Sequence, residues 1–341
     1  MIKRIININS VIKEYFVIIY FLFIPLLSYL VTSGLINPIR DKSFQFGFFD
    51  IPDERKLHSN NIVRLGGISI FIGFLVGIFI LLLGNALGLN LNVSNQEYDF
   101  IIKVLIGASI FFLLGTLDDL FRISPYLRLF VEFFTILILA YKGLIFNKFD
   151  FLPFYSYKIE LNNNISIIAN IIWIAGVTNA VNWLDGIDGL TAIYVSIILT
   201  TLLIISLSKG LILTSLTLLI LIFCIFGFYK FNKHPAKILM GDGGAYFLGF
   251  ILSTFAVFLS SNKGESYSIL IPITLLSVPI LDMTFVILKR LFNYESIFLP
   301  DRSHLHHRLQ DNGISYENTL RIIISTIIFT SISSLFFYRL I

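Results

Sequence analysis

The sequence predicts an all-α, polytopic integral membrane protein, a helical bundle with about ten transmembrane helices. Of its 341 residues, 56% are hydrophobic and only 13% are charged, whereas a soluble domain carries roughly 25% charged residues. Apolar stretches long enough to cross about 30 Å of hydrocarbon recur from one end of the chain to the other. Because no polar segment between them is long enough to fold separately, residues 1–341 are expected to form a single transmembrane domain.

The apolar segments are each expected to be helical, because lipid cannot satisfy open backbone groups. They lie near 15–36, 66–89, 100–117, 127–146, 165–181, 189–207, 211–229, 244–260, 267–291 and 320–340. Lys3 and Arg4 precede the first segment as they would in a signal peptide, but no small-residue cleavage site follows, so we expect a retained helix. The single cysteine, Cys224, excludes an intramolecular disulfide.

The order of the helices assigns the polar loops to two faces of the membrane. One face receives nearly all the polar motifs, and its loops are 37–65, 118–126, 182–188, 230–243 and 289–319. This face also carries more lysine and arginine, which assigns it to the cytoplasm, although Lys3 and Arg4 argue for the opposite orientation. The net charge of +4 reflects these loop residues and does not indicate nucleic-acid binding.

Asp118 and Asp119 form an acidic pair at the end of the third apolar segment. Adjacent carboxylates repel each other, and near a membrane they are costly, so a bound cation or proton would relieve them. A solvated helix end before the turn at Ser124-Pro125 is the simpler alternative.

A longer polar block, N-A-V-N-W-L-D-G-I-D-G-L, runs from Asn179 to Leu190 between two apolar segments. Asn179, Asn182 and Asp185 are three residues apart and share one face if the helix continues through them. A turn alone would need one Asp-Gly step, whereas this block has two.

Asp242 lies in M-G-D-G-G, directly before another apolar segment and therefore at a helix N-terminus. It could cap that helix. Alternatively, it could hold Mg²⁺, which with the exposed N–H groups would bind a phosphate.

A histidine cluster at His304, His306 and His307 stands between Arg302 and Arg308. Zinc is disfavoured because no cysteine is nearby and the arginines repel a cation. A cationic cluster suits a diphosphate or sugar phosphate, with binding to lipid headgroups as the alternative. A second basic segment contains Arg55, Lys56 and His58 before Gly66-Gly67.

In these motifs the chain resembles the polyprenyl-phosphate N-acetylhexosamine-1-phosphate transferases. The resemblance rests on the acidic pair, the N-x-x-N-x-x-D-G-x-D-G-L block, the G-D-x-G block and the histidine cluster, in this order, from about residue 52 to 309. It departs from the family pattern at Val63, at Leu239, where the family often has a phenylalanine, and at Gly244.

The resemblance implies an Mg²⁺-dependent enzyme, with Mn²⁺ as an alternative metal, that works at the cytoplasmic face of the bacterial inner membrane. It implies that the enzyme transfers a sugar 1-phosphate from a UDP-amino sugar to undecaprenyl or another polyprenyl phosphate and releases UMP. It also implies roles for individual residues: Asn182 and Asp242 as metal ligands, Asp118 and Asp119 as catalytic groups, and Lys56, Asn179, Asp185, Asp188, Asn232, Arg302, His304, His306 and His307 as substrate contacts. Membrane lipids are expected partners, and a homodimer is compatible with the pattern.

The sequence H-L-H-H-R-L is similar to the branch that transfers N-acetylglucosamine phosphate or a related sugar phosphate. The phospho-N-acetylmuramoyl-pentapeptide transferases are the alternative branch. A lipid-linked sugar transporter is the alternative from another class, and Asp282, inside an apolar segment, is the feature that a transporter explains better.

Overall fold

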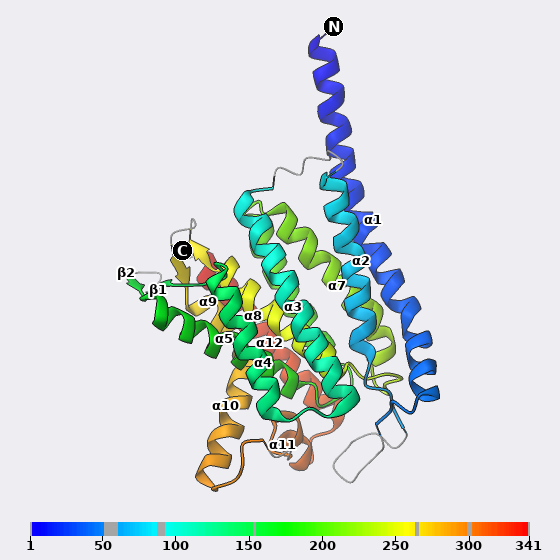
Figure 1. Cartoon of the computed structure of the whole chain (residues 1–341), viewed down its shortest axis with the longest axis vertical. Helices are drawn as coiled ribbons and strands as arrows, with labels where there is room; N and C mark the ends of the chain where they lie inside the picture. Colours follow the sequence, from blue (N-terminus) through cyan, green and yellow to red (C-terminus); the bar gives the residue numbers. More distant parts are fainter. Residues whose placement is uncertain are drawn as a thin grey trace.

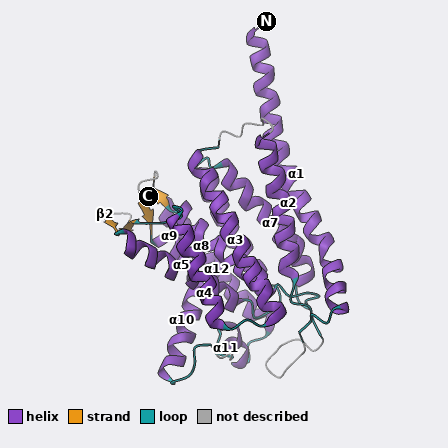
Figure 2. Cartoon of the chain, in the orientation of Figure 1, coloured by secondary structure: helices purple, strands orange, loops and turns teal. Residues whose placement is uncertain are grey.

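The computed structural model describes residues 2–50, 61–86, 93–152, 155–262, 266–298 and 302–339. In this part of the chain a helical bundle is joined by a small sheet (Figures 1 and 2). The helices are α1 (Ile2–Gln45), α2 (Gly66–Ala86), α3 (Asn95–Phe121), α4 (Pro125–Tyr141), α5 (Asn163–Leu184), α6 (Leu190–Ser208), α7 (Ile212–Asn232), α8 (Gly241–Leu259), α9 (Leu270–Leu275), α10 (Ser277–Phe292), α11 (Leu305–Asp311) and α12 (Tyr316–Arg339). The strands are β1 (Lys148–Leu152), β2 (Tyr155–Glu160), β3 (Ser261–Asn262) and β4 (Ser266–Ser268).

The expectation of an all-α membrane bundle is confirmed. Among the described residues, eight helices are long and apolar enough to cross a membrane, namely α1, α2, α3, α5, α6, α7, α8 and α12. The other two expected segments correspond to α4, which has 17 residues, and to the pair α9 and α10.

The expectation of one unbroken helix over 267–291 is wrong. The chain forms α9 and α10 with a break at Leu276. Pro279 accounts for the break, because it has no N–H to donate to the carbonyl of Leu275 and its ring crowds that carbonyl.

Helix α1 is longer than expected, because it continues to Gln45 and takes in the first part of the predicted loop 37–65. A short helix, α11, also lies inside the predicted loop 289–319. Hydropathy could not predict the C-terminal part of α1 or the short helix α11, because both segments are polar.

The small sheet was not expected either. Its strand order is β2-β1-β4-β3, with β1 and β4 parallel and the other neighbours antiparallel. It connects the chain after α4 with the chain after α8, and so lies at the bundle end where these two helices finish.

Helix α8 is the centre of the bundle and packs against α2, α3, α5 and α6 (Figure 1). Its membrane-length window is 94% buried, compared with 28% for α1 and 22% for α12. Glycines let neighbouring helices approach it closely: a Cβ on Gly249 would lie 2.7 Å from the Cα of Thr178 in α5. The first turn of α8 carries Asp242, so the packing of this helix determines where that carboxylate lies.

Candidate functional site

The paired glycines Gly66 and Gly67 position the start of α8. Their backbone N–H groups donate to the carbonyl oxygens of Leu239 (3.0 Å) and Met240 (2.8 Å). A Cβ on Gly67 would lie 2.3 Å from the backbone nitrogen of Gly244. Only glycine therefore permits this approach, which places the first turns of α2 and α8 side by side.

Asp119 is bound to the first turn of α8 by two hydrogen bonds. The backbone N–H groups of Asp242 and Gly243 each donate to its carboxylate at a distance of 3.0 Å. Two of the N–H groups expected to bind a phosphate are therefore directed at a side chain of α3. Asp242 itself is not the capping residue, since Met240 occupies the N-cap position and Asp242 lies inside the first turn.

Asp118, by contrast, forms an ion pair with Arg128 of α4. Arg64 provides a second guanidinium, 3.4 Å from Oδ1 of Asp242. The two arginines offset the mutual repulsion of the three clustered carboxylates, Asp118, Asp119 and Asp242. We call these five residues the acidic centre.

The asparagine block joins the acidic centre through Asn182. Helix α5 continues to Leu184, so Asn179 and Asn182 lie on one helix face, as the spacing predicts. Asn182 Nδ2 donates to Asp242 Oδ1 over 2.8 Å. Asp185 follows as the C-cap residue, and burial raises its pKa to about 6, with Arg64 acting in the opposite direction.

Asn179 is directed away from this centre. Its Nδ2 donates to Glu132 Oε2 of α4 over 2.7 Å, inside the bundle. It was expected to contact the substrate, but its described partners are protein groups.

Asp188 holds the loop that follows α7. Its Oδ2 accepts from the backbone N–H of Ala236 (3.0 Å) and lies 2.8 Å from Nδ1 of His234. The hydroxyl of Tyr316 donates to the backbone carbonyl of Asp188. Asp188 therefore joins three segments of the site, namely the asparagine block, the loop after α7 and the start of α12.

Asn232, expected to contact the nucleotide, is only 3% exposed. Its Oδ1 accepts from the N–H of Gly189 (3.1 Å), and its Nδ2 donates to the carbonyl of Ile238 (3.0 Å). Both ends of the amide are thus engaged with backbone, and Asn232 links the asparagine block to the segment before α8.

Asp282 anchors the histidine cluster, a contact that the sequence did not predict. Its Oδ2 lies 3.0 Å from Nδ1 of His304, and its Oδ1 accepts from the N–H of Leu305 (2.7 Å) and from Arg308 (3.2 Å). The one feature that favoured a transporter is therefore explained by the attachment of α11 to α10. Asp282 stood out in the sequence because an ionisable residue inside an apolar segment is a functional signal, but its partners were not predicted.

His306 is 1% exposed, and burial lowers its pKa to about 3, with His307 and His304 adding to the effect. His306 is therefore neutral near pH 7, so it can contribute a hydrogen bond to the cluster but no positive charge. Its ring packs on Gly186, where a Cβ would lie 2.2 Å from Nε2. Among the described residues, neither ring nitrogen has a hydrogen-bond partner.

The remaining expected contacts lie around this cluster or outside the described part. The ring of His307 is 4.3 Å from that of His306, between centroids. Arg302 forms a surface ion pair with Asp311 (2.7 Å) across α11. Lys56, with Arg55 and His58, lies outside the described residues.

The donor set around Asp242 fits magnesium. Asn182 and Asp242 supply hard oxygen donors, and Mg²⁺ typically uses one or two carboxylates together with water and substrate phosphates. Within the described ranges, no three His, Cys, Asp or Glu side chains form a ready-made metal cage. Asn182 and Asp242 are the side chains that could hold such an ion together with water and a substrate phosphate.

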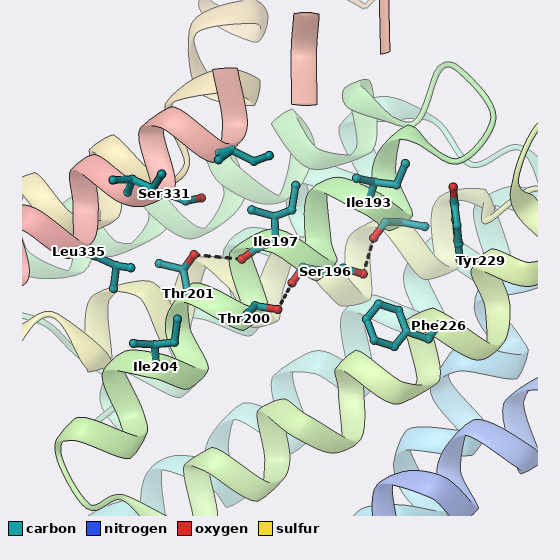
Figure 3. A pocket seen from close by; sticks show the side chains of 13 residues that line it. Ile193, Ser196, Ile197, Thr200, Thr201, Ile204, Phe226, Tyr229, Ser331 and Leu335 are labelled. Carbon is teal, nitrogen blue, oxygen red and sulfur yellow. Dashed lines mark hydrogen bonds between the residues drawn. The ribbon is translucent and has the colours of Figure 1, made fainter. Parts of the chain in front are cut away.

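A separate apolar groove of about 460 Å³ lies between α6, α7 and α12 (Figure 3). Three of its lining hydroxyls, those of Ser196, Thr200 and Thr201, donate to carbonyls within α6. It contains none of the acidic-centre residues, so it is distinct from the polar site.

The fold and the polar site together define a polytopic membrane protein whose chemistry-bearing residues meet at one end of the bundle. The family described as glycosyl transferase family 4 matches residues 101–260. This match includes the acidic pair, the asparagine block and Asp242.

Three relatives extend the likeness over most of the chain. A protein of Bacillus subtilis (strain 168), described as a probable undecaprenyl-phosphate N-acetylglucosaminyl 1-phosphate transferase, is 35% identical over 86% of this chain and 78% of its own length. An undecaprenyl-phosphate alpha-N-acetylglucosaminyl 1-phosphate transferase of Thermotoga maritima is 30% identical over 82% and 78%. A decaprenyl-phosphate N-acetylglucosaminephosphotransferase of Mycobacterium tuberculosis is 27% identical over 90% and 81%. The chain belongs to glycosyl transferase family 4.

Proposed function

We propose that this protein transfers N-acetylglucosamine 1-phosphate, or the 1-phosphate of a related N-acetylated amino sugar, from a UDP-sugar to polyprenyl phosphate. An oxygen of the lipid phosphate forms a bond to the phosphorus that carries the sugar. The bond from that phosphorus to the bridging oxygen breaks, and its electron pair leaves with UMP. The observation that carries the proposal is the junction of Asp119, Asn182 and Asp242, because it brings three family motifs into one oxygen-rich site.

Magnesium would be held by Asn182 and Asp242. When bound, it neutralises phosphate charge and orients the diphosphate, which is most of what phosphoryl transfer requires of its catalyst. Arg64 and Arg128 supply fixed positive charge beside the carboxylates. In this arrangement Asp118 acts on the acceptor phosphate, while Asp119 holds the first turn of α8 in place.

The histidine cluster is assigned to the sugar-diphosphate side of the site. His304 is held by Asp282 through Nδ1, so its Nε2 is the nitrogen left for a substrate. Neutral His306 is suited to a hydrogen bond with the substrate and not to charge neutralisation. Its two buried ring nitrogens, which have no partner in the described part of the chain, support this assignment.

The direct test uses purified protein, undecaprenyl phosphate, Mg²⁺ and a panel of UDP-sugars, with UMP release as the readout. We expect turnover of UDP-N-acetylglucosamine or a deoxy relative. A competition assay against the muramoyl-pentapeptide nucleotide separates the two branches of the family, and preference for that nucleotide would overturn the assignment of the sugar. No UMP release from any UDP-sugar would refute the proposed function.

We also propose that the acidic centre faces the cytoplasm across a bacterial inner membrane. Lys233 and Lys142 are exposed residues that directly follow α7 and α4, at opposite ends of the bundle. In a Cys224→Ser background, Lys142→Cys should react with an impermeant maleimide in intact cells. Lys233→Cys should react only after the membrane is opened, and the reverse pattern would invert the orientation.

A further inference from the structure

A second polar layer lies beneath the acidic centre, inside the membrane-spanning part of the bundle. Asn179 Nδ2 donates to Glu132 Oε2 over 2.7 Å, and the hydroxyl of Tyr246 lies 3.4 Å from Asn179 Oδ1. Glu132 is 0% exposed and Tyr246 is 1% exposed. Three helices, α4, α5 and α8, are thereby linked through one asparagine side chain.

Each member of this layer lies one helical turn deeper than a residue of the polar site. The pairs are Arg128 and Glu132 on α4, Asn182 and Asn179 on α5, and Asp242 and Tyr246 on α8. Residues three or four apart on a helix share one face, about 5.4 Å apart along the axis. A rotation or slide of any of these helices would therefore move both members of its pair together.

Glu132 is costly at this position. A carboxyl group inside the bundle is expensive to bury, and a partly satisfied polar network is less stable than apolar packing. Oε1 of Glu132 has no hydrogen-bond partner among the described residues. An apolar side chain would pack α4 against α5 at lower cost, so bundle stability alone does not account for Glu132.

We propose that Glu132 is a positioning residue for the transfer site, acting through Asn179 and Tyr246 to hold α4, α5 and α8 in register. Asn179 is held at both ends of its amide: its Nδ2 donates to Glu132 and also to the carbonyl of Ala175 (2.9 Å), and its Oδ1 accepts from the Tyr246 hydroxyl. With that amide fixed, the next turn presents Asn182 to Asp242 at 2.8 Å. This role rests on the proposed function, since it concerns the residues assigned to magnesium and to the acceptor phosphate.

The chain offers a matched control in Glu97 of α3, another buried glutamate, which is 2% exposed. Its Oε1 accepts from the backbone N–H of Thr214, at the beginning of α7 and hence at the other end of the bundle. Substitution of either glutamate removes a buried carboxylate that joins two helices. Only Glu132 is connected to the polar site.

The test compares Glu132→Ala with Glu97→Ala in detergent, using Mn²⁺ affinity by electron paramagnetic resonance, kcat for UMP release, and thermal unfolding. We expect Glu132→Ala to weaken Mn²⁺ binding and to lower kcat, each by about 10-fold or more, as small misplacements of catalytic groups do. Glu97→Ala should lower the unfolding temperature with about the same kcat and Mn²⁺ affinity as the wild type. Glu132→Gln, which keeps an acceptor oxygen for Asn179, should restore most of the loss.

Two further variants keep the proposal testable if Glu132→Ala does not fold. Tyr246→Phe removes only the hydroxyl, and it should weaken Mn²⁺ binding in the same direction. Asn179→Ala should add little to the effect of Glu132→Ala or Tyr246→Phe, because the three residues act as one unit.

Wild-type Mn²⁺ affinity in Glu132→Ala and Tyr246→Phe, or effects that multiply in the double variants, would overturn the proposal. Failure of the wild type to bind Mn²⁺ would overturn it as well. If the wild type binds Mn²⁺ but releases no UMP, the proposed function fails, while the Mn²⁺ comparison still decides whether Glu132 positions the site.

Discussion

The carboxylate of Asp119 accepts a hydrogen bond of 3.0 Å from the backbone N–H of Asp242. One aspartate of the acidic pair therefore fixes the helix that carries Asp242, the third carboxylate of the acidic centre. Asp118, its neighbour in sequence, is paired with Arg128 of α4 instead. Two adjacent residues of the same type therefore have different tasks, and substitution should separate them.

Asp119→Ala should mainly destabilise the protein. It removes the carboxylate cap from the N-terminus of α8, a loss of about 1 kcal/mol for a typical helix cap. Thermal unfolding in detergent measures the effect, and the variant should melt below Asp118→Asn, which retains a side-chain oxygen for Arg128. Equal unfolding temperatures for the two variants would contradict the capping role.

Asp118→Asn should lower kcat by about 10²-fold or more, in the range that general-base catalysis supplies. An aspartate repels an anionic lipid phosphate in the ground state, so its contribution belongs to the chemical step. Steady-state kinetics for both substrates checks this expectation. A near-normal kcat with only a raised KM for the lipid would show that Asp118 is not catalytic.

Activity should require Mg²⁺ or Mn²⁺, because Asn182 and Asp242 are assigned as metal ligands. Asp242→Ala should abolish UMP release and the binding of Mn²⁺. Excess EDTA should stop the wild-type enzyme, and added Mg²⁺ should restore it. Undiminished turnover in EDTA would contradict the assignment of Asn182 and Asp242 as metal ligands.

The free energy of unfolding should fall as the pH drops below about 6.5, which is the ordinary pKa of histidine in the unfolded chain. In the folded protein the pKa of His306 is about 3, so only the unfolded state takes up the proton between these values. The loss from His306 is roughly 1.4 kcal/mol at pH 5.5. Unfolding temperatures at pH 8 and 5.5 measure it, and His306→Gln should show a smaller decrease. An unchanged decrease in that variant would assign the pH dependence to other groups.

Asp282→Asn should lower kcat/KM for the UDP-sugar by about 10-fold or more, the usual cost of losing the partner that orients a histidine. The amide cannot accept from His304, Leu305 and Arg308 as the carboxylate does. Asp41→Asn, at an exposed ion pair on α1, is the control and should behave as wild type. If both variants match the wild type, Asp282 does not orient the cluster.

The sequence predicted the helical bundle better than the contacts between its polar side chains. Long apolar segments report transmembrane helices directly, and the three-residue spacing of Asn179 and Asn182 correctly predicted one helix face. Pairing between distant helices leaves no such periodic signal. Glu132 and Asn179 are 47 positions apart, and Asp282 and His304 are 22 apart.

The sequence could not predict the charge state of His306 either, because that charge depends on contacts between distant segments. Three histidines beside two arginines look cationic in a sequence, but burial against Gly186 decides whether the ring can be protonated. The small sheet was missed because its strands are short, and because β1 and β4 come from opposite sides of α5 to α8 in the sequence.

The length of α8 has a consequence for the energetics of lipid substrates. Its 19 residues span about 28 Å, close to the thickness of the hydrocarbon layer, and Asp242 stands in its first turn. We therefore expect this carboxylate to lie near the depth of the phospholipid headgroups. A polyprenyl phosphate would then meet the acidic centre while its charged group stays outside the hydrocarbon. The length of α8 would thus set the depth at which the reaction takes place.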